Sequence, residues 1–142
     1  MQVLKTKRIL IVLACLLASV LVKAQQQQMT PEQEEKKIRE NIEQMVLKYE
    51  ESLNLEVWQT FYVDSILTHN YTSLMEESRA LAANKVENYD LYQIISDKWE
   101  ESTYNAFQKV LDEEQWKKYL KQGAARAKKN RDVRAAKREK KK

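Results

Sequence analysis

The feature that most limits the fold of this 142-residue chain is its lack of strong breakers: it has one glycine, Gly123, and one proline, Pro31. An all-β domain of this size needs turn residues about every 8–12 positions. The chain is instead rich in Glu, Lys, Ala, Gln and Leu, which are good helix formers. The sequence therefore predicts an all-α fold.

The first 24 residues have the form of a secretory signal peptide: a positive start, an apolar run and a small-residue cleavage site. The apolar run, Ile9 to Val22, has Ser19 as its single polar residue. It is shorter than the roughly 20 residues that a membrane-spanning helix needs. We expect cleavage after Ala24, a polar leader over residues 25–29, and export to the periplasm. Secretion and association with the outer membrane are the alternatives.

Two other interpretations of this segment stay open: the apolar run can be an uncleaved anchor helix, or Cys15 can carry a lipid. The bulky Leu13 makes Cys15 a poor lipidation site. Cys15 is the single cysteine of the chain, so ordinary cleavage leaves a mature chain with none. Disulfides, thiolate catalysis and cysteine metal sites are then excluded.

The formal net charge of +4 conceals two regions of opposite sign. Residues 117–142 contain 13 basic and 2 acidic side chains, whereas residues 25–116 contain 8 basic and 19 acidic ones. The other four basic residues belong to the predicted signal peptide. The mature chain is therefore nearly neutral, with an acidic body and a basic tail.

Apolar residues recur at helical spacing along the body. We expect about four helices, over residues 30–53, 56–81, 91–110 and 112–122. The expected arrangement is long and antiparallel, a thin helical hairpin or cradle that forms one domain over residues 30–122. A basic tail, residues 123–142, follows and is either helical or disordered.

Two segments of the pattern L-x-x-x-Q begin 56 residues apart, and each opens an expected helix. In the second copy Asp112 is a favoured N-cap, and Gln115 lies where a capping box places a glutamine. In the first copy Glu56 is a poor cap, so we expect the cap to shift to Asn54. The candidate helix-capping residues are Leu55, Gln59, Leu111, Asp112 and Gln115.

This pair resembles the L-T-x-x-Q motifs of the Spy/CpxP family of periplasmic chaperones and stress regulators. In that family the threonine caps a helix, the glutamine closes the capping box, and a cradle-shaped dimer holds unfolded clients on its concave face. Here Glu56 and Asp112 replace the threonines, and the basic tail departs from the family pattern. The resemblance covers about residues 30–122 and implies a homodimer that binds unfolded proteins without ATP.

The expected helices carry many aromatic side chains for a thin helical protein. Core packing is one interpretation, and an exposed apolar surface that binds a partner is the other. The candidate client-binding residues are Trp58, Phe61, Tyr62, Trp99 and Phe107.

The basic tail has three interpretations. It can be solvated charge, it can bind anionic lipid or cell-wall polymer, or it can lie on the acidic body of its own or a second chain. Nucleic acid is not an expected partner, because an exported protein rarely meets it. The candidate envelope-binding residues are Arg126, Lys128, Lys129, Arg131, Arg134, Lys137 and Arg138.

No catalytic, cofactor-binding or metal-binding set is predicted. His69 is the single histidine and has no convincing catalytic partner, and a chain with one glycine has no Gly-rich phosphate loop. The first hypothesis is a periplasmic, cofactor-free binding protein that shields unfolded clients or senses envelope stress. The alternative is a structural or adaptor protein of the cell envelope, anchored by its tail.

Overall fold

A computed structural model describes residues 30–140 of the chain. The predicted signal peptide and polar leader lie outside the described residues. The chain divides at residue 34, and the described residues on each side of this boundary are treated separately. The all-α prediction is confirmed, because residues 30–140 are almost entirely helical and contain no strand.

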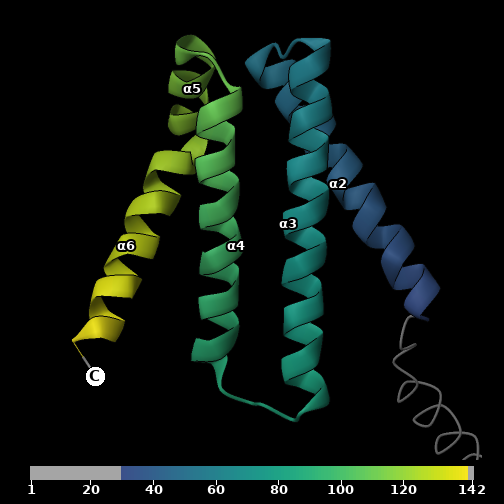
Figure 1. The fold of residues 1–142 in the computed structure, drawn as a ribbon, viewed down its shortest axis with the longest axis vertical. Coiled ribbons are helices and arrows are strands. Elements are labelled where there is room, and N and C mark those ends of the chain that lie inside the picture. Colours follow the sequence, from purple (N-terminus) through teal and green to yellow (C-terminus); the bar gives the residue numbers. More distant parts are fainter. Residues whose placement is uncertain (1–29, 141–142) are drawn as a thin grey trace, which may run out of the picture. The chain divides into compact units, whose positions relative to one another are not determined.

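The described part of the chain forms a succession of helices with short connections. They are α2 (Pro31–Leu53), α3 (Val57–Ala83), α4 (Tyr89–Val110), α5 (Glu113–Tyr119), the π-helical turn η1 (Leu120–Ala124) and α6 (Ala125–Glu139). α3 and α4 lie side by side and antiparallel (Figure 1). The helical option for the basic tail is the observed one, since α6 covers most of it.

Local sequence signals account for the ends of these helices. Within residues 30–34, the Thr30 hydroxyl accepts a hydrogen bond from the Gln33 backbone at 3.2 Å, and Gln33 Oε1 accepts one from the Thr30 N–H at 3.0 Å. The two bonds form a capping box. Asn88 caps α4 by accepting from the Asp90 N–H at 3.0 Å.

The hydrophobic core joins α2, α3, α4 and α5. Leu53, Val63 and Phe107 are fully buried in it. The Phe107 ring lies 5.3 Å from that of Tyr49 and 5.2 Å from that of Tyr119, centroid to centroid. Such aromatic pairs contribute about 0.5–1.5 kcal/mol beyond their buried area. A small aromatic cluster therefore ties the end of α4 to α2 and α5.

The single glycine lies at the passage from α5 into α6. Gly123 has a φ of 118°, a backbone conformation that residues with a side chain rarely adopt. It sits inside η1, where the helical hydrogen-bond pattern widens between the two α-helices. The chain thus uses its one glycine to change direction into the basic tail.

Candidate functional site

The second predicted motif forms a complete capping box at the start of α5. The Asp112 carboxylate accepts a hydrogen bond from the Gln115 N–H at 2.8 Å, and Gln115 Oε1 accepts one from the Asp112 N–H at 3.0 Å. Leu111, the motif leucine, is buried in the core. This copy has the geometry that its sequence predicts.

The first motif differs from the prediction in the residue that caps its helix. The N-cap of α3 is Glu56, in an extended conformation, and not Asn54. Asn54 has a φ of 54° and ends the preceding helix, so it is not placed to cap the next one. Gln59 Oε1 accepts a hydrogen bond from the Glu56 N–H at 2.9 Å. The motif leucine here, Leu55, is partly buried against the core.

The two motif glutamines bind each other, which sequence spacing does not reveal. Gln59 Nε2 donates to Gln115 Oε1 at 2.7 Å, and Gln115 Nε2 donates to Gln59 Oε1 at 2.9 Å. Both side chains are buried. We refer to Gln59 and Gln115 as the glutamine pair. It connects the start of α3 directly to the start of α5.

Each member of the glutamine pair also closes the end of another helix. Gln59 Nε2 donates to the carbonyl of Val110 at 3.0 Å, and Gln115 Nε2 donates to the carbonyl of Asn54 at 3.3 Å. With the capping bonds, each amide uses two N–H donors and accepts twice at its oxygen, which satisfies its full hydrogen-bonding capacity. The ends of α2 and α4 and the starts of α3 and α5 therefore meet at one buried network whose hydrogen bonds are all satisfied.

An exposed apolar surface lies next to this network, on the residues of α3 that flank Gln59. Four side chains in the first turns of α3 are largely open to solvent: Val57 (89%), Trp58 (51%), Phe61 (67%) and Tyr62 (51%). We call these four residues the aromatic surface. The Trp58 and Tyr62 rings meet edge to face at a centroid distance of 6.1 Å, and Trp58 Nε1 donates to the Glu56 carboxylate at 2.6 Å. An apolar group of this kind is typical of a binding site.

Two of the predicted client-binding residues do not belong to the aromatic surface. Phe107 was the wrong choice, because its side chain is fully buried among core aromatics. Trp99 is half-buried, and its ring meets that of His69, on α3, at a centroid distance of 5.6 Å. Helical periodicity marks apolar faces but does not say which of them a neighbour covers.

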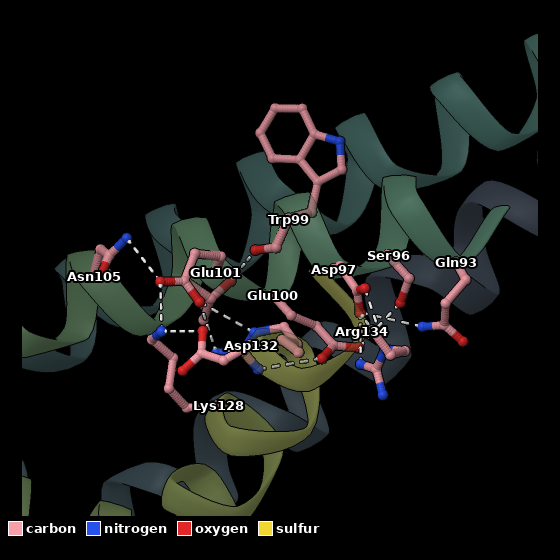
Figure 2. Close-up of polar contacts among 12 residues, drawn as sticks. Gln93, Ser96, Asp97, Trp99, Glu100, Glu101, Asn105, Lys128, Asp132 and Arg134 are labelled. Carbon is pink, nitrogen blue, oxygen red and sulfur yellow. Dashed lines mark hydrogen bonds and ion pairs between the residues drawn. The ribbon is translucent and has the colours of Figure 1, made fainter. Parts of the chain in front are cut away.

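The basic tail lies on acidic side chains of α4 (Figure 2). Arg134 and Arg138 both bind the Asp97 carboxylate, with shortest N–O distances of 2.5 Å and 2.8 Å. Arg131 binds Glu100 at 3.3 Å and Glu101 at 3.1 Å. The structure thus supports the interpretation in which the tail rests on the chain's own acidic body.

Two residues of this contact are buried charges. Asp97 and Arg131 are each only 6% exposed. Burial by itself raises the pKa of Asp97, but hydrogen bonds from Arg134 and Arg138 outweigh it and hold the pKa below its usual value. The Arg131 guanidinium also lies 5.7 Å from the centre of the Tyr104 ring, where a cation–π attraction adds to its ion pairs.

Sequence reasoning missed the role of the acidic residues on α4. None of Asp97, Glu100 and Glu101 was singled out from the sequence as a partner of the tail. The available signal was the pairing of these acids with basic residues spaced by three and four along the tail, which places the basic groups on one helix face. The seven predicted envelope-binding residues accordingly divide into two sets.

The first set contacts α4 and the second faces outward. Lys128 belongs with the arginines on α4, since its ammonium lies 3.5 Å from a Glu101 oxygen. Arg126, Lys129 and Lys137 are exposed, and no residue from 30 to 140 forms an ion pair with them. These three remain available to an external anion.

Comparison with protein-family models, with curated proteins and with solved structures found no match for the chain. Within residues 30–140, no helix has both the length and the hydropathy required to cross a bilayer. In the same part of the chain, no three His, Cys, Asp or Glu side chains gather closely enough to hold a metal ion.

Proposed function

We propose that the protein is an exported, ATP-independent binding protein that shields unfolded polypeptides by contact, as the resemblance to the Spy/CpxP family implies. The observation that carries this proposal is the aromatic surface. Hydrophobic side chains exposed to this degree are rarely grouped on a monomer without a partner. Their position beside the glutamine pair gives them a rigid support, because the network fixes the first turn of α3.

Charge is expected to assist the capture of clients. The acidic body and the basic tail present opposite signs, and a partly folded client that carries both can be attracted to each. Weak electrostatic contact raises the encounter rate more than the final affinity. The aromatic surface would then supply the attraction that holds an exposed apolar segment of the client.

Aggregation of a reduced or heated client tests this proposal directly. The chain of residues 25–142, which contains every residue the structure describes, is expected to suppress light scattering at near-stoichiometric amounts. Replacing Trp58, Phe61 and Tyr62 with Ser should remove most of the suppression. The matched control replaces Leu47 and Tyr89, which are 50% and 74% exposed elsewhere, and should retain it. An intact chain that gives no suppression at tenfold excess contradicts the proposal.

The second candidate, an envelope adaptor anchored by its tail, is favoured by one observation: the outward set of Arg126, Lys129 and Lys137. Each basic group near an anionic surface contributes on the order of 1 kcal/mol. Changing these three to Gln leaves the ion pairs with α4 in place, so it is a cleaner test than deleting residues 123–142. Loss of envelope association on cell fractionation would support the adaptor function, and retained association would exclude it.

A further inference from the structure

A cavity of about 480 Å³ lies among α2, α3, α4, η1 and α6, and none of the residues of the aromatic surface lines it. Its volume falls in the range of about 300–1,000 Å³ that is typical of small-molecule sites. Apolar side chains form most of its wall, among them Met45, Leu67 and Leu74. The cavity therefore suits a ligand with an apolar body.

Several polar groups that line this cavity are hydrogen-bond donors without a partner among the described residues. Tyr49 and Tyr119 both line it, and among residues 30–140 neither hydroxyl has a hydrogen-bond partner. Both phenols are protonated at neutral pH, and burial raises the pKa of each further. Lys48 also lines the cavity, is exposed, and forms no ion pair within the described residues. The Gln122 amide oxygen accepts from Ser52 at 3.3 Å, which leaves its NH₂ group for a ligand.

Two other charged residues that line the cavity already bind each other. Glu100 and Arg131 line the cavity and pair at 3.3 Å, so their charges largely cancel. The uncompensated charge at the cavity is then that of Lys48, a cation, and the phenols of Tyr49 and Tyr119 line the same cavity. Charge-assisted hydrogen bonds to such donors are short and strong when the ligand carries a carboxylate.

We propose that this cavity binds one single-chain anionic amphiphile, a long-chain fatty acid, with its carboxylate at Lys48 and the tyrosine hydroxyls and its acyl chain along the apolar wall. This site is separate from the aromatic surface and does not rest on the proposed client-binding function. A fatty acid here would contact α2, α3, α4 and α6 together, so it would also stabilise the folded chain.

Calorimetric titration of the chain of residues 25–142 with sodium dodecanoate, below its micellar concentration, tests the site. We expect one dodecanoate per chain, bound at least about tenfold more tightly than dodecyltrimethylammonium, which has the same tail and the opposite charge. The comparison is stringent, because the acidic body attracts the cation. K48Q should weaken dodecanoate about tenfold, and Y49F by about three- to tenfold. The control K37Q, on the same helix, should leave it unchanged.

Two further variants distinguish binding in this cavity from binding at the aromatic surface. A127W fills the cavity and should abolish binding of both amphiphiles, whereas W58S should leave dodecanoate affinity unchanged. Equal affinity for the two amphiphiles, loss of binding in W58S, or no effect of K48Q would each overturn the proposal. One dodecanoate per two chains would also overturn it, because the ligand would then lie between copies.

Discussion

Two contacts in this molecule hold helices together by different physical means. The core between α2, α3, α4 and α5 is apolar and aromatic, with Phe107 at its centre, whereas α6 meets α4 almost entirely through charged groups. Salt does not screen hydrophobic contact, but it does screen ion pairs with partial solvent exposure. The difference indicates that the core sets the stability of the fold and that α6 is held by a weaker, condition-dependent contact.

The largest expected effect on stability comes from a substitution in the hydrophobic core. Phe107→Ala removes a fully buried ring from contact with Tyr49 and Tyr119, and we expect a loss of about 3–5 kcal/mol in the free energy of unfolding. Urea denaturation followed by circular dichroism measures it. A loss below about 1 kcal/mol would show that the core is not organised around this ring.

The next effect in size concerns the glutamine pair. Gln115→Met keeps the length of the side chain but leaves Gln59 without its partner, and we expect a loss of about 2 kcal/mol because buried donors and acceptors are left unsatisfied. The double variant with Gln59→Met should lose less than the sum of the two single changes. Strict additivity in this cycle would mean that the two amides do not interact.

The third effect is confined to α6. Asp97→Asn removes the carboxylate that binds Arg134 and Arg138, and we expect faster amide hydrogen exchange over residues 125–139 with little change in the core. Raising NaCl to 1 M in the unchanged chain should act in the same direction. Equal acceleration in α3 and α6 would contradict a separate, charge-held contact.

Acid is expected to release α6 as well, with a defined direction. Because the pKa of Asp97 is lowered in the folded chain, its contribution to stability is complete above the ordinary Asp pKa of about 3.9. It is lost as pH falls below that value toward the lowered pKa. Hydrogen exchange of α6 at successive pH values, corrected for the intrinsic exchange rate, measures this loss, and Asp97→Asn should remove the part that Asp97 contributes.

The smallest effect belongs to an exposed ion pair on α5. Lys118 and Glu114 lie one helical turn apart at 3.4 Å, both largely solvated. Lys118→Ala should change the free energy of unfolding by less than about 0.5 kcal/mol, because exposed pairs contribute little. It is the control that separates the buried charges of α4 and α6 from ordinary surface charge.

Local chemistry made most of the fold predictable. Scarce breakers predicted the fold class, and the expected starts at residues 30 and 112 each lie within one residue of the observed helix starts. What could not be predicted depends on contacts between distant segments. The bond between Gln59 and Gln115, and the burial of Phe107 but not Phe61, follow from which helices pack together, and a single helix pattern carries no record of that. The contact of the tail with α4 was one of three interpretations that charge alone left open.

The saturated glutamine pair limits which substitutions this chain can accept during evolution. Each amide supplies a donor and an acceptor to the other, so a carboxylate or an apolar residue at one position leaves an unmet group at the other. Single changes at residue 59 or 115 should therefore be eliminated, while paired replacements that restore mutual bonding should be tolerated. In sequences that descend from this one, positions 59 and 115 are expected to covary, although 56 residues separate them.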